Sequence, residues 1–285
     1  GRDTVVAGAG DDAYKGGQGI DSLDLSSSTS GTTVNLSTGT ASGAGIGNDS
    51  VSSFEIVIGT DFNDIIVGST AAETLMGGGN ADSLEGGAGA DLLDGGLAID
   101  TVSYAGASAG VALNLASGGA GGDAAGDIYV SIERVSGSNF DDAIVGAANA
   151  ETLSGGLGSD LLDGGDGDDL LNGQSGTDSL FGAAGADTLN GGTGADTLTG
   201  AVGNDRFDFS AGFGADGIVD FTAGAGAGDV IRLIGLGAAF DSFAEISAAA
   251  TEVGVDTVID FGAGNTITLL GVSLTALNAD DFLFG

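Results

Sequence analysis

Carboxylates recur at a fixed spacing in this 285-residue chain, and oxygen-based metal binding is the chemistry they could perform. From Gly137 to Asp208 a nine-residue unit is repeated eight times without a break, and its sixth position is always Asp or Glu. The first position is always Gly, the fourth is Gly in the last six units, and the eighth is always large and apolar. A repeat in strict phase over this length indicates stacked structural units.

The sixth-position aspartates are the candidate metal ligands. Two carboxylates about 5 Å apart repel by about 3 kcal/mol at an effective dielectric of about 20, so stacked columns of them require a cation. The chain has no His and no Cys, which argues against zinc, copper and iron. Calcium accepts about 6–8 oxygen ligands in flexible geometry, so the sequence predicts several calcium ions. The predicted ligands are Asp3, Asp12, Asp21, Asp82, Asp91, Asp100, Asp160, Asp169, Asp178, Asp187, Asp196 and Asp205.

The residue types at the nine positions of the unit predict the elements that would position these carboxylates. Glycine accepts positive φ and allows close backbone approach, so positions one to six can form a tight turn with inward carbonyl oxygens. Positions seven to nine suffice only for a short strand, whose central apolar side chain points to one face. Stacked units then form a parallel coil with about 4.8 Å between layers. The predicted fold is an all-β solenoid with an apolar column as its core.

The unit resembles the RTX (repeats-in-toxin, or hemolysin-type) nonapeptide GGxGxDxUx, in which U is apolar. The resemblance implies a parallel β-roll with two nonapeptides per coil. It also implies that each calcium ion lies between turns two units apart, held by sixth-position Asp side chains and turn carbonyls. Glu151 departs from the sixth-position pattern, and Phe140 and Asn149 replace the fourth-position Gly. The first two units of this array, which also contain Asp142, are therefore expected to bind poorly.

The composition excludes several classes of partner. The formal net charge is −36, from 41 acidic and 5 basic residues, so neither nucleic acid nor an anionic membrane surface is an expected ligand. A chain this acidic should repel itself open when cations are absent. The lack of Cys rules out disulfides, and no stretch of about 18 apolar residues predicts a transmembrane helix.

The phase of the repeat divides the chain into six predicted parts, and residues 21–86 and 100–164 are two copies of a longer unit. The first nonapeptide starts at its fourth position, so further sequence is expected upstream. In the insertions, alternating apolar residues predict strands that extend the coil without ions. The parts are nonapeptides over 1–24, an insertion over 25–58, nonapeptides over 59–103, an insertion over 104–136, the main array over 137–208, and a C-terminal cap with a secretion signal over 209–285.

Single residues in and beside the insertions carry further predictions. Phe54 and Ile132, with Phe62 and Phe140, recur at matched places of the two copies and are expected to serve as core and cap. Two other predictions concern fourth positions of the short array. Asn80 is expected to adopt a left-handed turn, and Ala98 suggests that the turn is decaying there.

The C-terminal region differs in composition, because nine of the 13 Phe residues lie between Phe207 and Phe284. A stacked coil needs a cap over its open end. Residues 214–224 with 229–236 resemble 254–264 with 265–272, and each set is predicted to be a pair of strands. Residues 241–252 are predicted to form a helix with Asp241 as its N-cap. Two interpretations remain for Asp216, Asp220, Asp256 and Asp260, namely an extra ion or solvated turn acids.

The final residues, an acidic pair followed by Phe282-Leu283-Phe284, resemble an uncleaved type I secretion signal, and a final strand is the alternative. The sequence favours a secreted calcium-binding β-roll that folds after export through the type I secretion machinery and stabilises a larger exported protein. One alternative is a surface-layer, adhesive or filament protein that self-assembles with calcium at the cell surface. Another is part of a secreted polysaccharide-acting enzyme or toxin. Catalysis by this segment itself is not predicted, because the G-x-S-x-G match at 106–110 lacks a His base.

Overall fold

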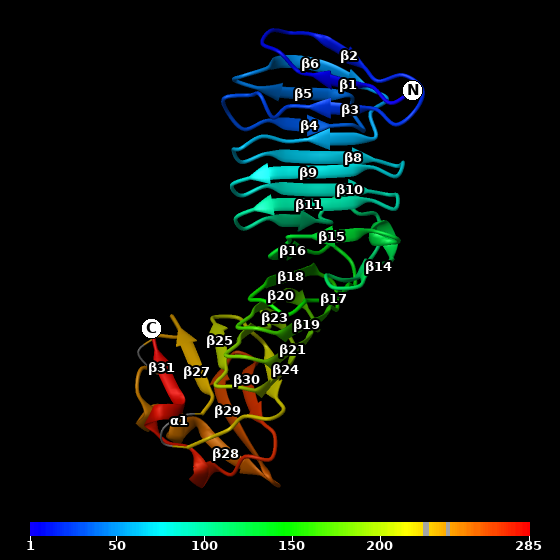
Figure 1. Ribbon diagram of the computed structural model, residues 1–285. Coiled ribbons are helices and arrows are strands. Elements are labelled where there is room, and N and C mark those ends of the chain that lie inside the picture. Colours follow the sequence, from blue (N-terminus) through cyan, green and yellow to red (C-terminus); the bar gives the residue numbers. More distant parts are fainter. Residues whose placement is uncertain (225–227, 238–239) are drawn as a thin grey trace. The chain divides into compact units, whose positions relative to one another are not determined.

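The computed structural model describes residues 1–224, 228–237 and 240–285 (Figure 1). The chain forms two compact units, Gly1–Ser138 and Asn139–Gly285. Each unit is built almost entirely of short strands, which confirms the predicted all-β class with parallel β-roll architecture and a β-rich C-terminal cap. None of the described helices is long and apolar enough to cross a membrane.

The first unit contains a six-stranded sheet in which every neighbouring pair is parallel. Where no insertion intervenes, paired residues such as Leu75 and Leu93 are separated by two nonapeptides. Two nonapeptides therefore make one coil. The strands, in spatial order, are β1 (Thr4–Val6), β3 (Ser22–Asp24), β7 (Ile56–Ile58), β9 (Thr74–Gly79), β11 (Leu92–Leu97) and β15 (Ile128–Val130).

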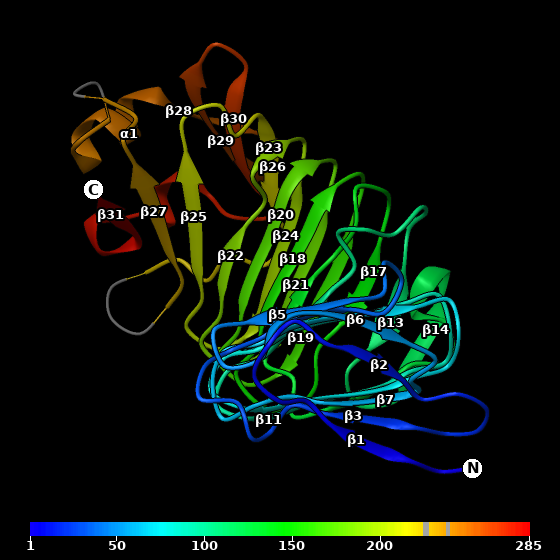
Figure 2. The ribbon, with the colours of Figure 1, turned by 90° about the horizontal axis from the view of Figure 1, so that it is seen from above.

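The opposite side of the first unit carries a second row of strands, and Figure 2 views the two rows along the stack. The insertion over 25–58 enters this row as an antiparallel meander of β4, β5 and β6, while the other neighbours pair in parallel. The order is β2 (Ala13–Lys15), β6 (Gly47–Ser52), β5 (Thr40–Gly43), β4 (Thr33–Asn35), β8 (Ile65–Ser69), β10 (Ser83–Gly87), β12 (Thr101–Ser103) and β16 (Arg134–Ser136). The second insertion forms the hairpin β13 (Ala112–Asn114) and β14 (Gly118–Gly121), followed by the 3-10 turn η1 (Gly122–Ala124).

The second unit repeats the two-sided arrangement with the main array. On one side the order is β18 (Thr152–Leu157), β20 (Leu170–Gly176), β22 (Thr188–Asn190), β25 (Arg206–Ser210), β27 (Val230–Ile234) and β31 (Phe282–Phe284), and β23 (Thr193–Gly194) pairs with β20. On the other side it is β17 (Ala143–Val145), β19 (Leu161–Asp166), β21 (Ser179–Ala184), β24 (Thr197–Val202), β26 (Ala215–Ile218), β30 (Asn265–Leu269), β29 (Asp256–Gly262) and β28 (Ala250–Val253).

The apolar eighth positions form the core of this unit. Leu171 pairs with Leu153 and Leu189 on one side, and Leu180 pairs with Leu162 on the other. These side chains have no exposed surface. Alternation along each strand directs the flanking seventh and ninth positions outward, which explains why the sequence needs only one apolar residue per nonapeptide.

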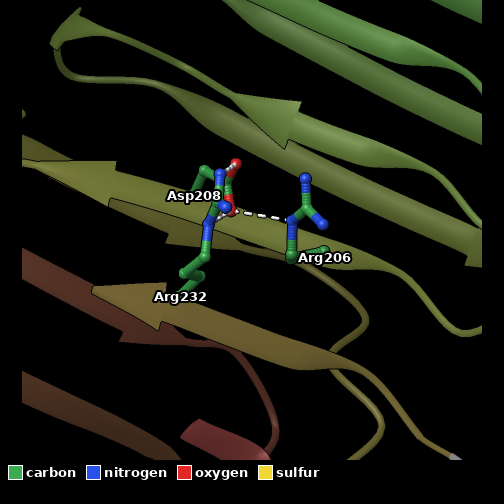
Figure 3. Close-up of polar contacts among 3 residues, drawn as sticks. All are labelled: Arg206, Asp208 and Arg232. Atoms are coloured by element: carbon green, nitrogen blue, oxygen red, sulfur yellow. Dashed lines mark hydrogen bonds and ion pairs between the residues drawn. The ribbon is translucent and has the colours of Figure 1, made fainter. Parts of the chain in front are cut away.

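An ion-pair cluster links the last array strand β25 to the cap strand β27 (Figure 3). Asp208 accepts hydrogen bonds from Arg206 Nε at 3.0 Å and Arg232 Nε at 2.8 Å, and Arg232 Nη2 also contacts it. Two of the five basic residues of the chain thus converge on one carboxylate. On the same strand, the ring of Phe209 packs edge to face on that of Phe213, with centroids 5.0 Å apart.

The structure corrects the predicted pairing in the cap. Strands β29 and β30 form the expected hairpin. Strands β26 and β27 do not pair with each other, because β26 continues the row of β24 and β27 continues the row of β25. Each therefore extends a different side of the roll. Within the described residues the final strand β31 pairs in parallel with β27, as the alternative interpretation of the C-terminal segment expected.

Other details also differ from expectation. The helix α1 spans Phe243–Ala249 and is shorter than predicted. Its N-cap is Ser242 rather than Asp241, and the Ser242 hydroxyl bonds to the Glu245 carboxylate. The short 3-10 turns η2 (Leu274–Ala276) and η3 (Ala279–Asp281) complete the cap.

The matched residues of the two copies divide into buried and exposed positions. Phe54 and Ile132 are buried, as expected of core residues. Phe62 and Phe140 are 42% and 44% exposed, so their predicted role in the core was wrong. Both lie in turns at fourth positions of the nonapeptide, where a side chain points away from the apolar column.

Two predictions concerned left-handed turns. Asn80 has φ of 63°, which confirms its predicted conformation. Ala98 has φ of 92°, so the left-handed turn persists there and the predicted decay was wrong.

Candidate calcium sites

The predicted ligands of the main array lie in the turns that precede the strands. Their exposed fractions are only 1–3%, although each carries a carboxylate. Alternate members fall on opposite sides of the roll, so they form two columns. Asp160, Asp178 and Asp196 precede β19, β21 and β24, while Asp169, Asp187 and Asp205 precede β20, β22 and β25.

One oxygen of each carboxylate bonds to the neighbouring coil. Oδ1 of Asp178 accepts the backbone N–H of Asp160 at 2.9 Å, and Oδ1 of Asp196 accepts that of Asp178 at 2.9 Å. The same bond joins Asp169 to Asp187 at 2.8 Å. A backbone donor in the preceding coil therefore orients each of these carboxylates.

The other oxygen, Oδ2, is buried and accepts no hydrogen bond from any residue that the structure describes. A buried acceptor left without a donor costs free energy, more so when it carries charge. The regularity of the set therefore points to a cationic ligand. Oδ2 atoms of this kind occur in Asp21, Asp82, Asp91, Asp100, Asp160, Asp169, Asp178, Asp187, Asp196 and Asp205, and also in Asp49 and Asp216.

Glycine at position one makes room for this oxygen. An ideal Cβ built on Gly164 would lie 2.4 Å from Oδ2 of Asp169 and 2.8 Å from the carbonyl oxygen of Gly182 in the next coil. On Gly173 it would lie 2.3 Å from Oδ2 of Asp178. The space that any other side chain would fill is thus bordered by a carboxylate oxygen and a backbone carbonyl oxygen, both hard ligands suited to calcium.

Glycine at position four brings a second carbonyl into the turn. Gly176 has φ of +151°, and an ideal Cβ on it would lie 1.4 Å from the carbonyl oxygen of Gly158 and 3.2 Å from Oδ1 of Asp178. Gly194 repeats this arrangement, with the Gly176 carbonyl at 1.6 Å. Fourth-position carbonyls therefore point toward the equivalent turn of the next coil, beside the aspartate.

Burial shifts the titration of these acids upward. Desolvation raises the pKa of Asp178 to about 6 and that of Asp160 to about 7 from the ordinary value of 3.8. The backbone N–H that each accepts lowers the pKa, and neighbouring carboxylates raise it further. Ionised carboxylates are unfavourable in these turns unless a cation offsets the desolvation.

No group of three or more His, Cys, Asp or Glu side chains converges anywhere in the described ranges. Each ion would therefore take one or two carboxylates and complete its coordination with backbone carbonyls. Calcium tolerates such a set, since it binds carbonyl oxygens and irregular geometry, whereas magnesium demands near-ideal octahedra and retains water. The buried Oδ2 atoms and the glycine-lined turns fit calcium.

The model of the RTX calcium-binding nonapeptide repeat (4 copies) matches residues 1–23, 67–102, 132–162, 145–180 and 181–216, which together make up half of the chain. The chain belongs to this family. The matches fall on the turns described above, and they leave residues 24–66, 103–131 and 217–285 unmatched. Calcium binding is the general property of RTX repeats, and the buried aspartates give it a physical basis here.

Solved structures of two proteins resemble this RTX chain. The extracellular lipase LipA from Serratia marcescens is 20% identical, with a TM-score of 0.38. The match covers 78% of this chain and 40% of the lipase chain. The AlgE6R3 subunit of the Azotobacter vinelandii mannuronan C5-epimerase is 29% identical, with a TM-score of 0.24, over 51% of this chain and 78% of that one. No curated protein sequence matches the chain.

Two of the predicted RTX ligands differ from the rest. Asp3 and Asp12 are exposed, just before the first two strands of the first unit. Oδ2 of Asp12 accepts the hydroxyl of Tyr14 at 3.0 Å. The expected weak unit around Glu151 also has a distinct geometry, because the backbone N–H groups of Ala147 and Asn149 donate to its carboxylate at 3.2 and 3.3 Å.

The four cap acids do not form one site. Asp216 continues a ligand column, because its Oδ1 accepts the backbone N–H of Asp196 at 2.9 Å and burial raises its pKa to about 7. Asp220 accepts the amides of Gly200 and Ala201 instead, while Asp256 and Asp260 lie on strand β29 and each accept a single backbone amide.

Sequence reasoning missed several acids that stand in the ligand columns. Asp64 is one of them, and both of its carboxylate oxygens already have hydroxyl donors. Oδ1 accepts the Thr32 hydroxyl at 2.7 Å, and Oδ2 accepts the Thr60 hydroxyl at 2.9 Å. Asp127 is another, and it accepts the hydroxyl of Tyr104 at 2.7 Å. The pattern Asp-x-apolar before a short strand was the available signal for Asp64 and Asp127.

Proposed function

We propose that this chain is a calcium-gated β-roll that folds when it binds calcium outside the cell and thereby stabilises a larger exported protein. The row of buried Oδ2 atoms without a donor in the described residues supports this proposal. Each of them makes the folded state costly until a cation neutralises it. Binding free energy is then folding free energy, as in other metal-dependent domains.

The net charge of the chain also makes folding depend on cations. With a net charge of −36, the compact state concentrates negative charge, and cations reduce the repulsion. Each site adds roughly 2.7 kcal/mol when calcium is about 100 times its dissociation constant. Extracellular calcium modules typically bind at about 10⁻⁴–10⁻³ M, well above cytosolic calcium. The chain would stay expanded before export through a type I system and would fold afterwards.

The test compares the hydrodynamic radius of the full chain in chelator, in magnesium and in calcium. The proposal expects an expanded chain in chelator and in magnesium, and a compact one in calcium. A chain that is equally compact in chelator would contradict calcium gating. Fusing a reporter domain to the N-terminus and measuring its protease resistance in the same buffers tests the stabilising role.

A second candidate is calcium-set assembly at a cell surface. The outer face of the six-stranded sheet favours it, because Met76, Ile128 and Val130, on strands β9 and β15, are 36%, 57% and 41% exposed. Exposed apolar area of this kind often marks an interaction surface. Light scattering in calcium distinguishes the two functions, since ordered growth of particles is expected only for assembly.

A further inference from the structure

The insertion over residues 25–58 contains a segment at the start of β6 with the features of the calcium turns, although the family match leaves residues 24–66 out. Asp49 lies on β6, which pairs in parallel with β2. Its side chain is 5% exposed, and its Oδ2 has no hydrogen-bond partner in the described part of the chain. A buried, unpartnered carboxylate oxygen is the same observation that marks the sites of the main array.

The hydrogen bonds of Asp49 reproduce those of the array. Its Oδ1 accepts the backbone N–H of Asp12 at 2.8 Å, as Oδ1 of Asp178 accepts that of Asp160 at 2.9 Å. The residue after Asp49 donates its N–H to the Asp12 carbonyl at 2.9 Å, and the residue after Asp178 donates to the Asp160 carbonyl at 2.8 Å. Asp12 and Asp49 are therefore related as successive sixth positions of one column, although an insertion separates them in the sequence.

The fourth positions agree as well. The N–H of Gly10 donates to the carbonyl of Ile46 at 3.0 Å, and the N–H of Gly158 donates to that of Ser175 at 3.0 Å. Gly47 has φ of +94°, and an ideal Cβ on it would lie 2.4 Å from the Gly10 carbonyl oxygen. The Gly10 carbonyl thus points toward the segment that holds Asp49, like the fourth-position carbonyls of the array.

We propose that the segment Gly47-Asn48-Asp49, at the start of β6, is a further divalent-cation site, selective for calcium, inside the insertion. Asp49 Oδ2 and the Gly10 carbonyl are the ligands that the geometry provides. The site rests on the proposed function, because it uses the same ligand chemistry. It differs from the expectation that this insertion extends the coil without ions.

The second copy of the long repeat supplies an internal comparison. Asp127 is the counterpart of Asp49 in that copy, and its Oδ1 likewise accepts a backbone N–H, that of Asp91 at 2.9 Å. Its Oδ2, however, accepts the Tyr104 hydroxyl, which also contacts the Tyr129 hydroxyl at 2.5 Å. The counterpart of Tyr104 in the first copy is Leu25, which has no hydroxyl to donate. In the second copy the Tyr104 hydroxyl satisfies Oδ2 of Asp127. In the first copy a cation would satisfy Oδ2 of Asp49.

The experiment counts calcium ions bound to the full chain by native mass spectrometry and calorimetric titration. Asp49→Asn should bind one ion fewer than the parent. Asp127→Asn is the matched control and should bind as many as the parent, while Asp178→Asn should lose an ion from the main array. If Asp49→Asn binds as many ions as the parent while Asp178→Asn binds fewer, the proposed Asp49 site is wrong but the proposed function stands. A parent that binds no calcium would overturn the proposed function.

Terbium luminescence provides a second measurement. Tyr14 donates its hydroxyl to Asp12 at 3.0 Å, so it is placed to sensitise an ion at the proposed site. Tyr14→Phe should lower tyrosine-sensitised terbium emission, and adding Asp49→Asn should lower it no further. If Tyr14→Phe leaves the emission unchanged, no lanthanide lies near the proposed site and the proposal is wrong, whether or not Asp49→Asn folds.

Discussion

The backbone N–H of Asp160 donates to Oδ1 of Asp178 at 2.9 Å. With the side chain held in this way, Oδ2 of Asp178 is buried and has no hydrogen-bond donor among the described residues. The same amide that fixes the side chain thus leaves half of the carboxylate for a cation. Because the relation recurs in every coil of the main array, coil geometry and ligand geometry are set by one repeated contact. The following predictions depend on it.

Asp178→Asn should have different effects with and without calcium. In saturating calcium, losing one site should lower the free energy of unfolding by roughly 2.7 kcal/mol at calcium about 100 times the dissociation constant. In chelator, the substitution removes a desolvated charge and should leave residual structure unchanged or more stable. Urea unfolding in both buffers measures this, with the exposed Asp166→Asn as control. Equal destabilisation in both buffers would mean that Asp178 is structural and not a ligand.

The neighbouring leucines Leu170 and Leu171 test the core column. Leu171 has no exposed surface, whereas Leu170 is 42% exposed on the outer face. In saturating calcium, Leu171→Ala should lower the free energy of unfolding by about 2–5 kcal/mol, because it leaves a cavity. Leu170→Ala should change it by less than about 0.5 kcal/mol. Similar losses from both variants, measured by urea unfolding, would contradict the assigned strand orientation.

The glycine at position four is required for close approach and not only for its φ. Gly176→Ala would place a Cβ 1.4 Å from the Gly158 carbonyl oxygen, so the turn must open and its calcium affinity should fall. Gly254→Ala is the control, since φ there is +73° but an ideal Cβ meets no described atom within 4 Å. It should cost only about 1 kcal/mol of strain. Calorimetric titration that finds equal calcium affinity in both variants would contradict the role of the turn carbonyl.

The pH dependence should reverse when calcium is added. The folded-state pKa values of Asp178 and Asp160 are raised to about 6 and about 7 from 3.8, so the folded state binds more protons than the unfolded state between these values. Without calcium, stability contributed by these groups is present below about pH 4 and is lost as the pH rises toward 7. Calcium requires the ionised carboxylate, so calcium affinity should rise across the same window. The β signal in far-ultraviolet circular dichroism between pH 4 and 8, with calcium and with chelator, measures both slopes, and parallel slopes would contradict the assignment.

Much of the roll could be predicted because its information is local and periodic. The apolar eighth position of each unit places residues such as Leu171 in the core, and the acidic sixth position places Asp178 in a turn, without any knowledge of distant partners. The cap was less predictable, because its two similar segments have different partners. Strands β26 and β27 look like a pair in the sequence, yet each finds its partner in a different row of the array.

The acids of the columns that the sequence did not reveal lie where the period is interrupted. Asp49 lies on the last strand of an antiparallel meander, so the insertion displaces it from the regular two-nonapeptide distance to its partner Asp12. Asp64 and Asp127 occupy column positions, but their carboxylates accept hydrogen bonds from the hydroxyls of Thr32 and Tyr104, which are distant in the sequence. Such contacts depend on three-dimensional pairing, which a local repeat pattern does not encode.

The most direct test of calcium-gated folding is far-ultraviolet circular dichroism of the full chain during a calcium titration, with magnesium as control. The account predicts little β signal in chelator or magnesium and a cooperative rise as calcium is added. A full β signal in chelator that calcium does not change would contradict it, because the roll would then fold without neutralising its buried carboxylates.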